Sequence, residues 1–208
     1  MMTLSIDKQE VQARPGWTVL ETARHYGIEI PTLCFHEAVS PSGVCRLCTV
    51  EIRDGKRTRL VAACMYPVVE GLLVFTDTKR VRNVRRWILE MLLSECPASQ
   101  EIKDMAARYG VTTTRFPIEN PEEECLLCGL CTRVCTEVVG LAAISTVNRG
   151  VHKKVGAPFM RPTDVCVECG CCVTICPTNA MQSRIESVRR QKTGFQIAAA
   201  SSQRRQEP

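Results

Sequence analysis

Two stretches of the sequence, CLLCGLCTRVC at 125–135 and CVECGCCVTIC at 166–176, share the cysteine spacing C-x2-C-x2-C-x3-C. This internal repeat holds nine of the fourteen cysteines. A disulfide scaffold would also be rich in cysteine, but it expects a short secreted chain with a signal peptide. The opening, MMTLSIDKQEVQARPGW, lacks the apolar core of such a peptide. We therefore expect a reducing, cytoplasmic environment, in which clustered cysteines hold metal or carry redox chemistry.

The repeated spacing has a physical reason. A [4Fe–4S] cube needs four thiolates directed at a compact core, and one tight loop can supply three of them at intervals of three residues. In two-cluster ferredoxins the fourth thiolate is the last cysteine of the other motif. Structural zinc, which prefers paired C-x2-C arms, matches this duplicated pattern less well. The rule predicts one cluster on Cys125, Cys128, Cys131 and Cys176, and a second on Cys135, Cys166, Cys169 and Cys172.

The adjacent pair Cys171 and Cys172 poses a choice of register. Only Cys172 keeps the repeated spacing, so Cys171 falls on a spacer position and is not expected to be a ligand. We expect Cys171 to be a small, buried apolar residue near the cluster.

A third cysteine set, with the spacing C-x10-C-x2-C-x15-C, precedes the repeat. Plant-type [2Fe–2S] ferredoxins carry C-x4-C-x2-C and a distant fourth cysteine, so here only the first gap is longer. A zinc site could also use one C-x2-C pair and two single cysteines. The candidate [2Fe–2S] ligands are Cys34, Cys45, Cys48 and Cys64.

The surroundings of this set favour the [2Fe–2S] interpretation. Short strands are expected at 3–7 and 9–13, joined by a turn at Asp7-Lys8, and a hairpin is expected around the Asp54–Gly55 turn.

Between these strands, Thr18 and Glu21 form a capping box for a helix that ends before Gly27. Two strands, a helix, a cysteine loop and a hairpin match a β-grasp ferredoxin domain. We therefore predict an α+β chain with a β-grasp [2Fe–2S] domain at its N-terminus and a two-cluster bacterial-type [4Fe–4S] ferredoxin domain at its C-terminus.

Four segments follow from these patterns. Residues 78–95 have apolar side chains at 81, 84, 88, 91 and 92, which predicts a helix with its basic residues on the other faces. A second helix is expected from Ser99 to Tyr109, a strand at 141–148 and a turn-rich loop at 156–162. The predicted domains are 1–78 (β-grasp), 79–115 (helical segment), 116–187 (two [4Fe–4S] clusters) and 188–208 (basic, flexible tail).

The chain is slightly basic, with a formal net charge of +5. Much of the excess lies at 79–86 and 189–208. Nucleic-acid binding is one reading of such runs, but no recognition motif accompanies them. We expect a solvated helix face and a loose tail. No apolar run approaches the roughly 18 residues of a membrane-spanning helix.

This order of elements resembles the N-terminal part of the large iron–sulfur subunit of respiratory NADH dehydrogenase (complex I). It is also similar to the small diaphorase iron–sulfur subunit of NAD-reducing hydrogenases, and to ferredoxin portions of iron-only hydrogenases and NAD-dependent formate dehydrogenases. The resemblance covers about residues 1–185. It rests on the twelve candidate ligand cysteines and on CPTNAM at 176–181.

One departure from these relatives concerns the helical segment. In the relatives, this segment usually carries a further [4Fe–4S] cluster held by one histidine and three cysteines, with the histidine in a pattern like LLSNHP. This chain reads LLSECP, with Cys96 at that position, and residues 98–110 contain no cysteine. The resemblance therefore implies that this cluster is missing and that Cys96 is a packing thiol, not a ligand. His36 lies two residues from Cys34, and we expect it to be a loop residue rather than a group that tunes the cluster.

Three clusters without a dinucleotide-binding G-x-G-x-x-G or a catalytic triad predict a non-catalytic electron-transfer subunit that itself binds no flavin or NAD. The resemblance implies a hetero-oligomeric NAD(P)-linked oxidoreductase, with a flavin-containing diaphorase subunit on one side and a hydrogenase or formate dehydrogenase subunit on the other. Alternatives are a freestanding soluble polyferredoxin, an iron–sulfur redox sensor, and an enzyme in its own right. The last would need an open metal site or a substrate pocket.

Overall fold

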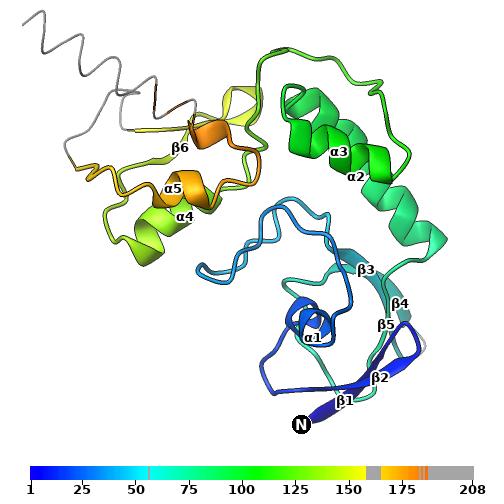
Figure 1. The fold of residues 1–208 in the computed structure, drawn as a ribbon. Coiled ribbons are helices and arrows are strands. Elements are labelled where there is room, and N and C mark those ends of the chain that lie inside the picture. Colours follow the sequence, from blue (N-terminus) through cyan, green and yellow to red (C-terminus); the bar gives the residue numbers. More distant parts are fainter. Residues whose placement is uncertain (56, 158–164, 183, 185, 187–208) are drawn as a thin grey trace, which may run out of the picture. The chain divides into compact units, whose positions relative to one another are not determined.

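The computed structural model describes the chain except for residues 56, 158–164, 183, 185 and 187–208. The chain divides into two compact units, Met1–Cys128 (unit 1) and Gly129–Pro208 (unit 2) (Figure 1). Among the described residues, no helix is both long enough and apolar enough to cross a membrane.

A five-stranded mixed sheet forms the base of unit 1. Its spatial order is β2-β1-β5-β3-β4, in which β1 and β5 are parallel and all other neighbours are antiparallel. The β1–β2 turn lies at Asp7 and Lys8, both with positive φ (49° and 72°), as the tight turns of twisted hairpins require. The strands are β1 (Met2–Ile6), β2 (Gln9–Ala13), β3 (Thr49–Asp54), β4 (Arg57–Ala62) and β5 (Leu73–Phe75).

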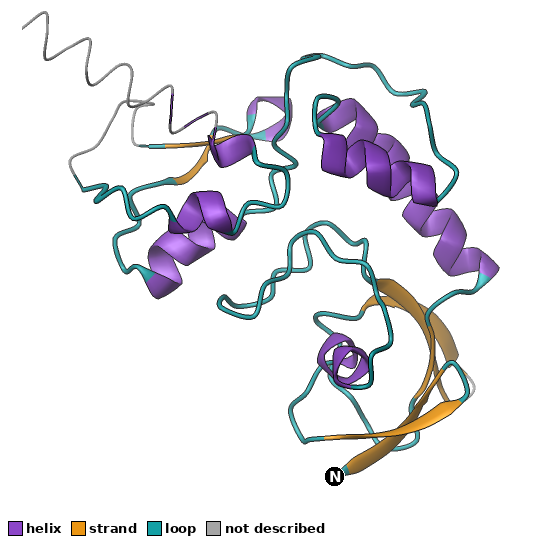
Figure 2. Ribbon diagram, in the orientation of Figure 1, coloured by secondary structure: helices purple, strands orange, loops and turns teal. Residues whose placement is uncertain are grey.

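Helix α1 (Val19–His25) packs its apolar face on this sheet, and Figure 2 shows the strands curving around it. The predicted capping box is present: Thr18 Oγ1 accepts from Glu21 N, while the Glu21 carboxylate accepts from Thr18 N at 2.7 Å. Val19 and Leu20 are fully buried and join the sheet residues in one core. The N-terminal ferredoxin-like domain expected from the sequence is thus confirmed. Strand β5 was not predicted.

Two further helices belong to unit 1. Helix α2 (Lys79–Glu95) begins after the N-cap Thr78, and α3 (Gln100–Arg108) begins after the N-cap Ser99. Both helices were expected. The buried face of α2 differs from the predicted stripe, because it consists of residues 81, 85, 88, 89 and 93. The expectation that all basic residues of α2 lie on other faces is wrong, since Arg85 is only 4% exposed.

Unit 2 is built from short elements. Two of its helices, α4 and α5, contact one another, and β6 pairs with β7 as an antiparallel two-stranded sheet. The strand expected at 141–148 is shorter, because only β6 forms there. The elements are α4 (Leu130–Arg133), the π-helix η1 (Val134–Val138), β6 (Ser145–Val147), the 3-10 helix η2 (Gly150–His152), β7 (Lys154–Gly156) and α5 (Cys171–Thr174).

The remaining domain expectations stay predictions. The boundaries proposed at 78, 115 and 187 are not tested by the division at Cys128, which groups the helical segment with the sheet in unit 1. The tail at 188–208 and most of the loop at 156–162 lie outside the described residues.

Candidate metal centres

The four cysteines of the first set all belong to unit 1 and are all buried. Cys34 lies in the loop after α1, Cys45 and Cys48 lie in the loop before β3, and Cys64 follows β4. The fully buried Leu47 anchors the middle loop between its two cysteines. The structure therefore brings all four predicted [2Fe–2S] ligands to the same unit.

Within this set the thiols form two pairs. Cys48 Sγ lies 3.4 Å from Cys64 Sγ. The Cys45 backbone N–H donates to Cys34 Sγ at 3.4 Å, and a hydrogen bond from Cys45 lowers the pKa of the Cys34 thiol to about 5. The interaction with the Cys64 thiol likewise lowers the pKa of Cys48 to about 7, and the pKa values of the other member of each pair, Cys45 and Cys64, are raised. Within each pair, the interaction between the two thiols favours the thiolate form of one of them.

The cysteine loop needs an unusual backbone. Gly43 has φ +63°, and a Cβ built there would come within 2.8 Å of Met65 Cγ, so a side chain is disfavoured on two grounds. Arg46 also has a positive φ of 58°, and its carbonyl accepts from Thr49 N at 3.1 Å. Both cysteines of this turn, Cys45 and Cys48, are buried before β3 begins.

The donor set suits a binuclear cluster. With four cysteine ligands, each iron of a [2Fe–2S] cluster takes two thiolates, and the structure presents two pairs. The hydroxyl oxygen of Ser42 is buried, and this hydroxyl helps to lower the pKa of the Cys34 thiol. Donors of this kind stabilise the thiolate form that an iron ion requires. Within the described part of the chain, no three potential ligand side chains converge so as to hold a single metal ion.

In the duplicated motif, the repeated spacing is accompanied by a repeated backbone. Leu127 and Glu168 occupy the same position of the two motifs and have φ of 55° and 54°. Gly129 and Gly170 also match, with φ of 72° and 79°, and each is the N-cap of a four-residue helix. Successive N–H groups in such alternating conformations form the concave nests that surround many iron–sulfur clusters. Both loops are therefore shaped alike, as the internal repeat predicts.

One predicted crossing of ligands has a counterpart in the geometry of unit 2. Burial raises the pKa of the Cys172 thiol, and the charges of Cys166, Cys169 and Cys135 raise it further. The π-helix η1, which carries Cys135 of the first motif, contacts α5, which carries Cys172 of the second. The Ala143 backbone N–H donates to Cys135 Sγ at 3.3 Å. The two motifs therefore meet at these two helices, and the four-residue ligand set itself stays a prediction.

Two cysteines outside the predicted ligand sets behave differently. Cys171 is only partly buried, so the expectation of a buried apolar residue is wrong; its thiol interacts with that of Cys169, which is exposed. Cys96 is fully buried at the end of α2, where its Sγ donates to Leu92 O at 3.1 Å. Burial raises the pKa of Cys96 to about 12. None of the fourteen cysteines, all of which are described, forms a disulfide.

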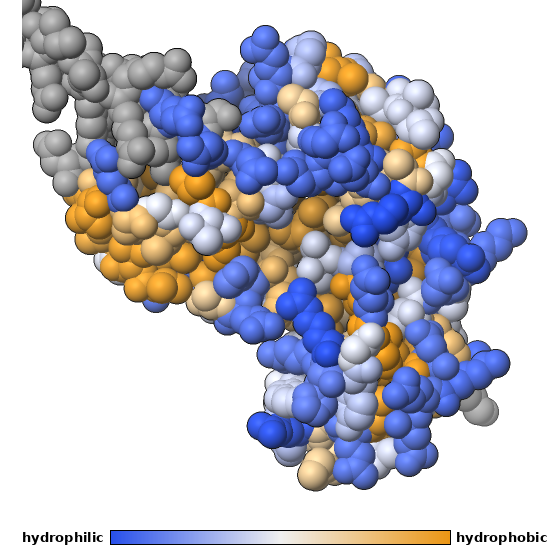
Figure 3. All heavy atoms as spheres, viewed as in Figure 1, coloured by the Kyte–Doolittle hydropathy of each residue, from blue (hydrophilic) through white to orange (hydrophobic). Residues whose placement is uncertain are grey.

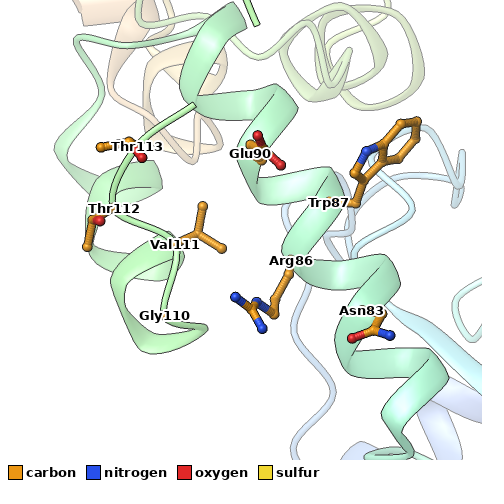
Figure 4. A pocket seen from close by; sticks show the side chains of 8 residues that line it. All are labelled: Asn83, Arg86, Trp87, Glu90, Gly110, Val111, Thr112 and Thr113. Carbon is orange, nitrogen blue, oxygen red and sulfur yellow. The ribbon is translucent and has the colours of Figure 1, made fainter. Parts of the chain in front are cut away.

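His36 is exposed, and its Nδ1 accepts from the Ala38 backbone N–H at 3.1 Å, which agrees with a loop histidine. A cavity of about 360 Å³ lies elsewhere in unit 1, between α2 and the turn after α3 (Figure 4). Polar side chains and Trp87 line it, and no cysteine does, so it is separate from the candidate cluster sites.

Comparisons with known proteins agree with the first cysteine set. Residues 1–79 match the family described as the 2Fe-2S iron-sulfur cluster binding domain. An NADH-quinone oxidoreductase subunit of Rickettsia bellii is 32% identical over 178 residues, which cover 74% of this chain and 26% of that protein. The NADH-ubiquinone oxidoreductase 75 kDa subunit of Reclinomonas americana is 32% identical over 173 residues, covering 72% of this chain and 25% of that one.

The chain therefore spans about a quarter of the length of these curated relatives. The match to a solved structure covers a larger share of the related chain. A chain in the crystal structure of an NAD+-reducing [NiFe]-hydrogenase in the H2-reduced state is 31% identical, with a TM-score of 0.66, and the match covers 75% of this chain and 74% of that chain. With the cluster-binding domain and both kinds of relative in agreement, the chain belongs to the iron–sulfur protein family that includes these two NADH oxidoreductase subunits and a chain of NAD+-reducing [NiFe]-hydrogenase.

Proposed function

We propose that the chain is an electron-transfer subunit of a multi-subunit NAD(P)-linked oxidoreductase. In this proposal Cys34, Cys45, Cys48 and Cys64 hold one [2Fe–2S] cluster. Two [4Fe–4S] clusters are held by the crossed sets Cys125, Cys128, Cys131 and Cys176, and Cys135, Cys166, Cys169 and Cys172. The observation that carries the proposal is the arrangement of thiols: two pairs in unit 1, and matched left-handed turns in both copies of the repeat.

The chain's contribution to this function is to hold the clusters and set their potentials. Bound clusters supply the one-electron chemistry. Backbone N–H groups, such as those of Cys45 and Ala143, donate to cysteine sulfurs at 3.4 and 3.3 Å. Hydrogen bonds of this kind and burial are the means by which a protein tunes iron–sulfur potentials. The partners proposed from the relatives are a flavin-containing, NAD(P)-binding diaphorase subunit and a catalytic subunit such as a hydrogenase or formate dehydrogenase.

An exposed apolar surface on unit 2 favours a fixed subunit over a freestanding polyferredoxin. Val138, Val165 and Val167 are 55%, 52% and 64% exposed, and Figure 3 shows apolar side chains gathered over unit 2. Apolar surface that is contiguous and exposed marks sites of protein association. Two of these valines flank Cys166, so a partner seated there would lie beside a cluster-binding loop. We place the complex in the cytoplasm, where thiols stay reduced.

The test is a count of iron and acid-labile sulfide per chain on protein purified without oxygen, with the metal of any co-purified partner subtracted. The expected value is about 10 irons, from 2 + 4 + 4. A value near 8 would show that no [2Fe–2S] cluster is bound, and a value near 2 would show that neither cube is bound. Co-purification decides between the two functions, because a fixed subunit retains its partners through gel filtration whereas a freestanding carrier elutes alone.

A further inference from the structure

Helix α2 buries an arginine. Arg85 is 4% exposed, while Arg82 and Arg86 on the same helix are exposed. An arginine in a protein keeps its positive charge, and charged side chains are almost never this buried unless they are paired. A buried charge without an acidic partner is unfavourable, so its presence indicates a functional role.

The contacts of Arg85 leave its charge uncompensated. One guanidinium nitrogen, Nη2, donates to the Thr49 carbonyl at 2.9 Å, and Nη1 lies 3.4 Å from the Tyr109 hydroxyl. The third nitrogen, Nε, has no partner among the described residues, and no ion pair found there includes Arg85. Glu51, two residues along β3 from Thr49, is engaged by Arg80 at 3.1 Å. Neutral oxygens thus hold the guanidinium in place without neutralising it.

The position of this charge is fixed relative to the first cysteine set. Thr49 follows Cys48 directly, and its N–H donates to the Arg46 carbonyl within the cysteine loop. Arg85 Nη2 lies 2.9 Å from the Thr49 carbonyl oxygen. Standard covalent geometry then places it less than about 12 Å from Cys48 Sγ. Arg85 is therefore a buried positive charge within about 12 Å of one sulfur of the proposed [2Fe–2S] site.

We propose that Arg85 raises the reduction potential of the [2Fe–2S] centre by holding its charge near Cys48. This inference rests on the proposed function, because it requires a cluster at the four cysteines of unit 1. Reduction adds one electron to that centre, so a nearby positive charge favours the reduced form. In this proposal Arg85 acts on the cluster through the electric field of its charge and does not bind the cluster as a ligand.

The size of the effect follows from the separation. Two unit charges about 12 Å apart, in an effective dielectric of about 20, interact strongly enough to change an equilibrium constant about tenfold. For a one-electron couple, a tenfold change corresponds to about 59 mV. Salt screens a buried charge little, so the effect persists at ordinary ionic strength.

The experiment is an anaerobic redox titration of the full chain with mediator dyes, in which electron paramagnetic resonance follows the reduced [2Fe–2S] signal. At the midpoint of the unmodified protein, Arg85→Met is expected to lower the ratio of reduced to oxidised cluster about tenfold. Arg85→Lys keeps the charge and is expected to stay close to the unmodified midpoint. Arg86→Met is the matched control: it removes the same charge from the neighbouring, exposed position and should leave the midpoint unchanged.

A second variant tests the proposal separately, in case Arg85→Met does not fold. Tyr109→Glu retains Arg85 and brings a carboxylate toward its Nη1, so it should also shift the midpoint to more negative values. The inference is overturned if both variants keep the signal and the unmodified midpoint, or if Arg86→Met shifts it as far as Arg85→Met. If the unmodified protein shows no [2Fe–2S] signal, the proposed function fails and this inference falls with it; an unmoved midpoint in the presence of the signal counts against Arg85 alone.

Discussion

Replacing Cys96 with alanine tests whether the helical segment holds a metal cluster. The Cys96 side chain has no exposed surface, and its Sγ donates to the Leu92 carbonyl, which also accepts from the Cys96 backbone N–H at 2.9 Å. The carbonyl therefore stays paired in Cys96→Ala. The substitution removes one buried sulfur, comparable to a buried methylene worth about 0.8 kcal/mol, and leaves a small cavity. We expect a loss of about 1–2 kcal/mol of stability and no loss of iron.

The assay combines an iron count with a thermal unfolding scan at a fixed rate. For a chain of this size, 1–2 kcal/mol corresponds to a decrease of roughly 2–8 °C in the unfolding midpoint. The matched comparison is Cys128→Ala, which removes another buried sulfur from unit 1 but is predicted to cost the four irons of one cube. If Cys96→Ala also lost four irons, Cys96 would be a ligand. The prediction that the helical segment holds no cluster would then be refuted.

The thiol chemistry of Cys96 gives an independent check. Burial raises its pKa from 9.0 to about 12, so the folded protein disfavours the thiolate. Because the folded-state value is the higher one, the stabilisation is complete below about pH 9 and is lost as the pH rises from 9 toward 12. Iodoacetamide at pH 8 should therefore leave Cys96 unmodified in the folded protein. Rapid alkylation there would contradict the buried, protonated thiol.

Three further predictions concern the local structure and the other cysteines. Thr18→Ala removes the cap of α1 and should cost about 1 kcal/mol, whereas Thr18→Asn should cost little; equal losses would refute the capping argument. Cys45→Ser should lower the iron content by two and leave about eight irons, and an unchanged count would exclude it as a ligand. Cys172→Ser should lose one cube and Cys171→Ser should lose none, which iron analysis of the two variants checks; the reverse result would shift the register of the second motif.

The sequence predicted unit 1 well where the signals are local. The Asp7–Lys8 turn and the capping box at Thr18 each depend on a few neighbouring residues, and both are present. Strand β5 (Leu73–Phe75) was missed because its three residues are too few to show a periodicity, and it owes its place to parallel pairing with a strand far away in sequence. Non-local pairing of this kind leaves no signature in a short window.

The buried face of α2 was mispredicted for a related reason. Apolarity alone selected Val84 and Met91, which are only partly buried, while the structure buries Arg85 and Leu93. Helix α2 contacts both β3 and α3, so two partners decide which residues are covered. A charged residue on that face goes against the pattern on which amphipathic prediction depends. Such a conflict between local pattern and tertiary structure is expected where a residue serves a function.

In unit 2 the sequence indicated the cysteine spacing but not the backbone conformation of the two cysteine loops. Leucine and glutamate at 127 and 168 disfavour the left-handed conformation, which costs roughly 1–2 kcal/mol for residues other than glycine, yet both adopt it. Residue type therefore argued against the geometry that the two loops share. Because Leu127 and Glu168 hold the same position of the repeat, their shared strain indicates a structural demand common to the two loops.

The two units differ in what can hold them together. Unit 1 closes an apolar core between α1 and the sheet, with Leu20 and Ile52 fully buried. In the described part of unit 2, α4 and η1 together cover only 130–138, α5 has four residues and the strands have three. Helical runs of these lengths are below the length at which a helix is stable by itself. Most of its cysteines are only partly buried. Metal binding and folding are coupled in domains of this kind, so in the proposed function the cube on Cys135, Cys166, Cys169 and Cys172 serves unit 2 as its core.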